Sequence, residues 1–159
     1  MKSKAHTQAG HALTGLILSI FRLNGRLLQA GDRLVAGLDL SSARWQVLGA
    51  IALAEQPQPV AWLARNMGLN RQGVQRIVNE MRDDGLLEIQ PNPHHRRAHL
   101  VVLTKRGKEA FEAAAKLQAP WVNGLAEGVS LKDLATTQKV VAELCGRLET
   151  SLNGDADEG

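Results

Sequence analysis

The segment from residue 59 to residue 104 changes its apolar spacing from helical to strand-like, and this change restricts the possible folds more than any other feature. Residues 60–67 and 71–84 carry apolar side chains at helical spacing, with Gly68 between the two runs. Residues 86–90 and 99–103 are apolar again and are separated by a turn that contains two prolines. We therefore predict a short helix, a longer helix and then a β-hairpin.

Capping residues define the ends of these elements. Asn70 is a preferred residue at a helix N-terminus, and Gly85 favours the backbone conformation that ends a helix. Pro91 and Pro93 disfavour helix and stiffen the hairpin tip, which we expect to be extended. Thr104 is positioned to cap a further helix, which we expect Pro120 to interrupt or kink.

Helices are expected on both sides of this segment. Ser41 and Ser42 can cap a helix that ends before the Gln-Pro-Gln-Pro turn, and Ser130 can cap a last helix. The last helix has near-heptad apolar spacing, at Leu134, Val141, Leu144, Leu148 and Leu152. A long first helix carries one apolar stripe, at Leu13, Leu16, Ile17, Ile20, Leu23, Leu27, Leu28, Leu34, Val35 and Leu38. A chain this short cannot form a groove along the full length of this helix. We therefore expect a helix of a partner chain to cover the apolar stripe.

The longer helix of the central segment has the residues of a DNA recognition helix. In a helix-turn-helix unit the second helix lies in the major groove and offers its early residues to base edges. Arginine can fork onto guanine and glutamine can pair with adenine, and Gly73 leaves room for close approach. A plain amphipathic helix with a solvated polar face is the alternative reading. The predicted recognition residues are Asn70, Arg71, Gln72, Gln75 and Arg76.

The charge distribution supports a polyanion partner. Nine basic and four acidic residues lie between Arg65 and Lys108, whereas the rest of the chain is slightly acidic. Arg96 and Arg97 stand at the predicted hairpin tip, where packing gives no reason for two adjacent guanidinium groups. A hairpin after a helix-turn-helix is the winged variant, whose arginines can reach an adjacent minor groove.

The stretch LARNMGLNRQGVQRIVNEMRDDGLLEIQPNPHHRRAHLVVLTKRGKEAF resembles the winged-helix core of the MarR family of bacterial transcription regulators. The flanking helices match as well, so the resemblance covers nearly the whole chain. It implies a mainly α fold with a small β-hairpin wing, in one domain over residues 1–153. The winged helix-turn-helix core would span about 41–104, the helical dimerisation region about 9–38 and 105–153, and residues 154–159 would form a disordered acidic tail.

The wing departs from the family pattern at one place. The family's wing commonly carries Asp-x-Arg, and His95, Arg96 and Arg97 occupy those positions here. Arg97 matches the arginine that reaches the groove, whereas the acid that orients the wing is replaced by His95. An imidazole could form a hydrogen bond there instead. The predicted wing residues are His95, Arg96 and Arg97.

A metal site and a catalytic site are the rival interpretations of the histidine-rich tip. His94 and His95 diverge on an extended tip, and neither cysteine nor carboxylate lies between Pro91 and Thr104. The sequence contains no recognisable catalytic motif, and Cys145, the only cysteine, suits a buried position in the last helix. We therefore expect no enzyme activity, no metal and no cofactor.

The resemblance implies a cytoplasmic homodimer that binds a pseudo-palindromic double-stranded DNA operator and acts as a repressor. A small, aromatic or phenolic effector would relieve repression by binding between the dimerisation and DNA-binding regions. Trp45 is the candidate pocket residue, with core packing as its alternative role. Two further alternatives are a helical small-molecule-binding or adaptor protein that has lost its operator, and a metal-responsive regulator. No membrane association is expected, since no apolar run is long enough to span a bilayer.

Overall fold

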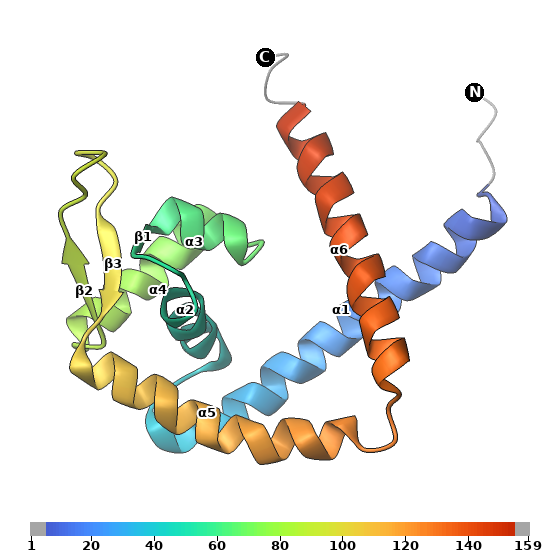
Figure 1. The fold of residues 1–159 in the computed structure, drawn as a ribbon, viewed down its shortest axis with the longest axis horizontal. Coiled ribbons are helices and arrows are strands. Elements are labelled where there is room, and N and C mark those ends of the chain that lie inside the picture. Colours follow the sequence, from blue (N-terminus) through green and yellow to red (C-terminus); the bar gives the residue numbers. More distant parts are fainter. Residues whose placement is uncertain (1–5, 155–159) are drawn as a thin grey trace. The chain divides into compact units, whose positions relative to one another are not determined.

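The computed structural model describes residues 6–154 of the 159-residue chain. These residues form two compact units that divide between Ala119 and Pro120. The elements follow in the order α1 (Gln8–Val35), the 3-10 helix η1 (Ala36–Leu38), α2 (Ser42–Ala52), β1 (Gln58–Pro59), α3 (Val60–Asn66), α4 (Arg71–Asp83), β2 (Leu87–Gln90), β3 (Leu100–Leu103), α5 (Lys105–Ala126) and α6 (Leu131–Gly154). The predicted fold class, mainly helical with a small hairpin, is confirmed (Figure 1).

The first unit contains the winged helix-turn-helix. Helices α2, α3 and α4 pack together, and the β2–β3 hairpin follows α4 and extends beyond it as the wing (Figure 1). Their apolar side chains meet those of the end of α1, the hairpin and α5 in one core. The fully buried large side chains of this core are Val35, Val47, Leu48, Leu63, Val74, Val78, Met81 and Val101. Burial of the apolar face of α4 leaves its polar face at the surface.

The sheet has a strand that the sequence did not reveal. Its order is β1-β3-β2, and both pairings are antiparallel. Strand β1 pairs Gln58 with Val101 and Pro59 with Leu100, in a stretch that we predicted to be only a turn. Pro59 is compatible with this position because β1 is an edge strand, where a residue without an N–H group removes no ladder hydrogen bond.

The predicted helix caps are confirmed. The side chain of Ser41 accepts a hydrogen bond from the backbone N–H of Arg44 over 3.3 Å at the start of α2. At the start of α5, the hydroxyl of Thr104 accepts one from the backbone N–H of Gly107 over 3.1 Å. Gly85 has φ of +75°, and the N–H groups that follow α4 bond back to Arg82 and Met81. This is the Schellman arrangement, which ends the recognition helix sharply.

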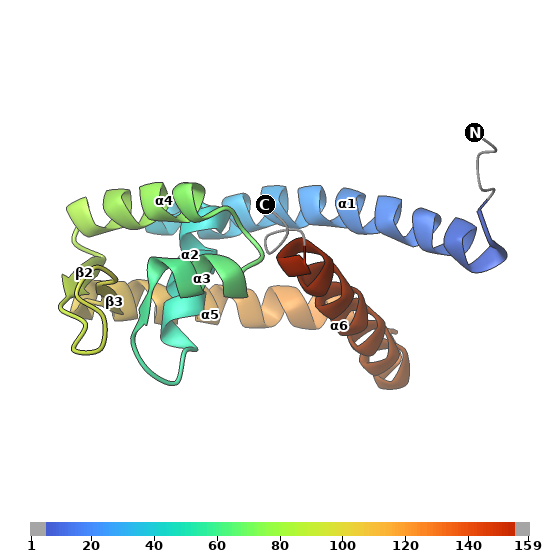
Figure 2. The same cartoon turned by 90° about the horizontal axis from the view of Figure 1, so that it is seen from above.

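Helix α1 is one long helix that ends before the predicted limit, because η1 replaces its last turn at Ala36–Leu38. Its C-terminal part is tied to α2, where Ser42 donates a hydrogen bond of 2.7 Å to the carbonyl of Leu28 and its N–H donates to Asp32 over 2.6 Å. The N-terminal part extends away from the other elements of the first unit (Figure 2). Its apolar stripe is therefore exposed, at Leu16, Ile17, Leu23, Leu27 and Leu28.

Pro120 lies inside α5, so it does not interrupt the helix, and the kink that we expected as the other possibility stays a prediction. One proline removes a single ladder hydrogen bond, and α5 continues to Ala126. In the second unit, Ser130 accepts a hydrogen bond from the N–H of Asp133 over 3.4 Å and begins α6, as predicted. Helix α6 exposes Leu131, Leu134, Val141 and Leu148, and it includes Gly154. Cys145 on this helix is exposed, so the prediction that it is buried was wrong. The predicted tail and the side chain of Leu152 lie outside the described residues.

Candidate nucleic-acid interface

The first turn of α4 is held by a helix cap and carries exposed polar side chains. Gly68, with φ of +63°, ends α3 and turns the chain so that Asn70 can begin α4. The carboxamide oxygen of Asn70 accepts hydrogen bonds from the N–H groups of Gln72 and Gly73, over 2.8 and 3.3 Å. Because these N–H groups are satisfied, the first turn is fixed and Arg71 and Gln72 project from it into solvent.

Four of the five predicted recognition residues are exposed, and one is not. Asn70, Arg71, Gln72 and Arg76 are at the surface, and Arg76 lies 3.6 Å from Glu80 in an exposed ion pair. The prediction that Gln75 is exposed was wrong. Its side chain is half-buried, and its amide donates a hydrogen bond of 3.0 Å to the carboxamide oxygen of Asn79, one helical turn further on.

Asn79 is therefore a site residue that the sequence analysis missed. It shares the polar face of α4 with Arg71 and Gln75, since residues four apart lie one above the other on a helix. The spacing of these three residues could have revealed it. The hydrogen bond between Gln75 and Asn79 fixes one amide group of each side chain, so the centre of this face is rigid as well as polar.

The wing tip is folded back, and the prediction of an extended tip was wrong. The N–H of His95 donates to the carbonyl of Asn92 over 3.3 Å, and the N–H of Ala98 donates to the carbonyl of His95 over 3.1 Å. Two successive turns thus form the tip, in the stretch that the sequence predicted to be a turn, and the backbone there is not extended. Pro93 suits this geometry, because its ring fixes the φ angle that the second residue of a turn requires.

Asn92 holds these turns together. Its side-chain amide donates a hydrogen bond of 2.8 Å to the carbonyl of Ala98, and its side-chain oxygen accepts one of 3.0 Å from the N–H of His94. His95 contributes backbone groups only, and its imidazole forms no hydrogen bond with any residue that the structure describes. The wing support that we expected from the side chain of His95 is thus supplied by Asn92, another residue that the sequence analysis missed.

Arg96 and Arg97 lie in the second of these turns and are exposed. No ion pair links either guanidinium group to an acid among residues 6–154. Both side chains therefore remain available to a polyanion. The loop between β2 and β3, which forms the tip, lies at the end of the hairpin that is farthest from α5 (Figure 1).

The C-terminal end of α4 is anchored to two other helices. The guanidinium of Arg44 in α2 pairs with the carboxylate of Asp84. Arg106 in α5 donates a hydrogen bond of 2.7 Å to the carbonyl of Asp84, and Thr104 donates one of 2.8 Å to the carbonyl of Gly85. These cationic and hydroxyl donors satisfy carbonyl groups at the negative end of the helix, so they fix the direction of α4.

Comparison with known proteins identifies this architecture. A family model described as MarR family matches residues 38–98, which contain α2, the helix-turn-helix and most of the wing. An uncharacterised protein of Mycobacterium tuberculosis is 34% identical over 123 residues, which are 77% of this chain and 85% of that protein. The chain belongs to the MarR family. The relatives that carry a functional name are transcription regulators, and this MarR-family protein is a transcription regulator as well.

Other similar proteins agree with the family in function or in fold. The transcriptional activatory protein BadR of Rhodopseudomonas palustris is 26% identical over 147 residues, 90% of this chain and 83% of BadR. The crystal structure of MosR from M. tuberculosis in complex with DNA has a TM-score of 0.71 at 24% identity, covering 84% of this chain and 96% of that chain. The structure of CouR from Rhodococcus jostii bound to p-coumaroyl-CoA has a TM-score of 0.73 at 20% identity, covering 83% and 91%.

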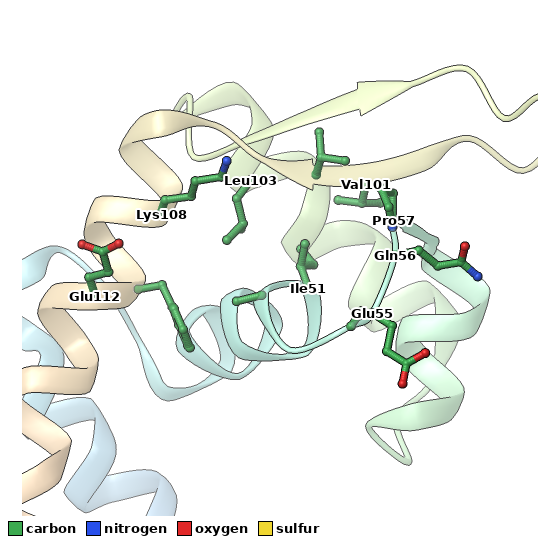
Figure 3. Close-up of a pocket in the computed structure, with 12 residues that line it drawn as sticks. Ile51, Glu55, Gln56, Pro57, Val101, Leu103, Lys108 and Glu112 are labelled. Carbon is green, nitrogen blue, oxygen red and sulfur yellow. The ribbon is translucent and has the colours of Figure 1, made fainter.

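A cavity of about 500 Å³ lies in the first unit of this MarR-family chain. Ile51 reaches it from α2 and Leu103 from β3, while Lys108 and Glu112 line it from α5 (Figure 3). Its volume is in the range of small-molecule sites. Trp45 does not line this cavity; it is half-buried and packs against the hydrophobic core. Its assignment to an effector pocket stays a prediction.

Metal and membrane sites have no structural counterpart in the part of the chain that the structure describes. Residues 6–154 contain no group of three or more histidine, cysteine, aspartate or glutamate side chains that could hold a metal ion. None of the helices described combines the length and the apolar character needed to cross a bilayer.

Proposed function

We propose that the protein acts as a homodimer in which each copy inserts α4 into the major groove of one operator half-site and its wing into the adjacent minor groove. One observation carries this proposal. The exposed first turn of α4 and the exposed Arg96 and Arg97 belong to one unit in which α4 and the hairpin pack on each other. Both can therefore contact the same duplex without a change of fold.

Dimerisation is supported by apolar surface. Helix α1 exposes large side chains along its stripe, and Phe21 beside them is 69% exposed. Helix α6 exposes large apolar side chains at spacings of three and seven residues, at Leu131, Leu134, Val141 and Leu148. Continuous apolar surface on two helices is costly in water, and a second copy of the chain removes it. A pseudo-palindromic operator follows from the two-fold symmetry of such a dimer.

A small molecule is proposed to regulate DNA binding. The cavity between α2, β3 and α5 is lined mainly by apolar side chains, and β3 is a strand of the wing, so an occupant contacts the DNA-binding unit directly. The likeness of fold to CouR bound to p-coumaroyl-CoA supports an effector of mixed apolar and polar character. We propose a cytoplasmic repressor released by this effector, with binding alone as its activity and no catalytic step.

Titration of the DNA upstream of the protein's own gene, at fixed salt, tests the proposal. Wild-type protein is expected to bind it specifically, and Arg97→Ala is expected to weaken binding about tenfold, a factor that corresponds to about 1.4 kcal/mol. The same variant should lose preference for A·T-rich sequence beside each half-site. Lys116→Ala removes one positive charge from the exposed side of α5 and serves as the control. Unchanged affinity of Arg97→Ala would contradict the placement of the wing in the minor groove.

The outcome that would contradict this proposal is a protein of this fold that binds a small molecule and no operator. The cavity supports this reading as well as it supports a regulator. The same titration separates the two, because an adaptor would bind all DNA sequences with equal, weak and strongly salt-dependent affinity.

A further inference from the structure

A basic cleft separates the recognition helix from the wing. Its volume is about 180 Å³, and its walls come from α4, the wing and the stretch that leads into α3. Three arginines and one histidine are among its lining residues, and none of the lining residues is acidic. The lining residues are Pro59, Val60, Ala61, Arg71, Gln75, Asn79, Arg82, Ile89, Arg97, Ala98, His99 and Val101.

The chemistry of this cleft selects a small anion. Three guanidinium groups and one imidazole converge on a volume below the range of about 300–1,000 Å³ that organic ligands occupy. Arginine is the side chain that best matches the oxygens of a phosphate. Gln75 and Asn79, which are hydrogen-bonded to each other, add polar groups without charge.

Arg82 lies on the same face of α4 as the polar residues of the cleft. Residues 71, 75, 79 and 82 lie on one face of a helix, because their separations of four, four and three residues follow the helical repeat. Two nitrogens of Arg82, Nε and Nη2, are 3.1 and 2.9 Å from one oxygen of Asp83. Asp83 thus occupies the Nε and Nη2 edge of the guanidinium, and the N–H groups of Nη1 remain available to a ligand.

The position of the cleft identifies the source of the anion. Arg71 belongs to the first turn of α4 and Arg97 to the wing tip, and the proposed function places these elements in neighbouring grooves. The feature of a duplex that lies between neighbouring grooves is a sugar-phosphate strand. We propose that the cleft binds one backbone phosphate of the operator, with Arg82 and His99 as its ligands, while Arg71 and Arg97 flank the cleft and extend into the two grooves. This inference rests on the proposed function.

The dependence of affinity on salt tests the phosphate site. Each neutralised phosphate contributes about −0.9 to the slope of log affinity against log salt concentration. Arg82→Gln is therefore expected to make the slope less steep by about 0.9 for each copy of the protein and to weaken all sequences equally. Lys116→Gln is the matched control, since it removes one charge from an exposed position outside the cleft. Equal slopes for Arg82→Gln and Lys116→Gln overturn the proposal, and so does a change of base preference in Arg82→Gln.

A second arm locates the phosphate. Operators are made with a neutral methylphosphonate at one position at a time along the strand between the recognition-helix and wing footprints. One position is expected to weaken binding by the wild type severalfold and to have no further effect on Arg82→Gln, as coupled partners in a double-mutant cycle do. Additive losses at every position overturn the site while leaving operator binding intact. Failure of the wild type to prefer any operator overturns the proposed function itself, so the two failures are distinguishable.

Discussion

The side chain of Asn92 closes the wing by donating a hydrogen bond of 2.8 Å to the carbonyl of Ala98. The two partners are six positions apart in the sequence, and both exposed arginines of the wing lie between them. The tip is therefore a small loop that is closed by its own hydrogen bond. Its shape does not depend on the side chain at position 95.

Replacement of Asn92 by aspartate removes the donor and keeps the acceptor. The hydrogen bond to Ala98 is lost, while the one from the N–H of His94 remains. We expect affinity for operator DNA to fall about three- to tenfold, because a hydrogen bond of this kind contributes about 0.5–1.5 kcal/mol. Gln90→Glu, on the neighbouring strand, makes the same change of charge without opening the tip. Fluorescence anisotropy titration measures the affinity of both variants for operator DNA. An equal loss of affinity in the two variants would show that the effect comes from charge alone.

Asn70 is expected to control both the stability of α4 and its contact with DNA. Asn70→Ala removes the acceptor for the N–H groups of Gln72 and Gly73 and should lower the free energy of unfolding by about 1 kcal/mol. Asn70→Asp keeps the cap and should retain the stability of the wild type, but its negative charge should weaken DNA binding. Urea denaturation followed by circular dichroism measures the first effect. Equal destabilisation by alanine and aspartate would be inconsistent with capping.

Gly107 allows α5 to lie directly against the end of the recognition helix. A Cβ atom at this position would collide with the carbonyl oxygen of Leu86 and lie 3.5 Å from Cβ of Leu103. Gly107→Ala is therefore expected to lower the free energy of unfolding by about 1–3 kcal/mol. At Gly124, on the same helix, an added Cβ meets no atom within 4 Å. Gly124→Ala should be neutral or stabilising by up to about 1 kcal/mol, and thermal melts that rank the two variants otherwise would disprove the contact.

A charge on the apolar stripe of α1 is expected to break the dimer. Ile17→Glu would bury an unpaired carboxylate against the partner helix, which costs several kcal/mol. Multi-angle light scattering at micromolar concentration should then give the mass of one chain, and operator affinity should fall with it. Gln29→Glu places the same group on the opposite face of the helix and should leave the dimer intact. A monomeric wild type would remove the basis of the two-site operator.

The sequence predicted the elements whose signals are local. Asn70 and Gly85 mark the ends of α4 because each acts on the backbone within a few residues of itself, and both acted as expected. Strand β1 could not be predicted in this way. It has only two residues, and its pairing partner in β3 lies about forty positions further along the chain.

The site residues show the same limit. Exposure of Arg71 and Arg76 follows from helical periodicity, which the sequence displays. The hydrogen bond between Gln75 and Asn79 depends on the rotamers of the two side chains. The hydrogen bond from Asn92 that closes the wing tip depends on a turn that brings Ala98 close to it. Neither hydrogen bond can be predicted from the spacing of residues in the sequence. The histidines and arginines of the tip attract attention in the sequence, whereas an ordinary asparagine organises them.

Thr104 joins three elements. Its hydroxyl donates to the carbonyl of Gly85 after α4 and accepts from the N–H of Gly107 in α5, and Thr104 directly follows the last residue of β3. With Gly107 packed on Leu86, this joint has no free hinge. We therefore expect the recognition helix, the wing and the first turns of α5 to rotate as one lever. In a dimer, the distance between the two recognition helices then depends on the orientation of these two rigid bodies. An effector can change that orientation without unfolding any part of the DNA-binding surface.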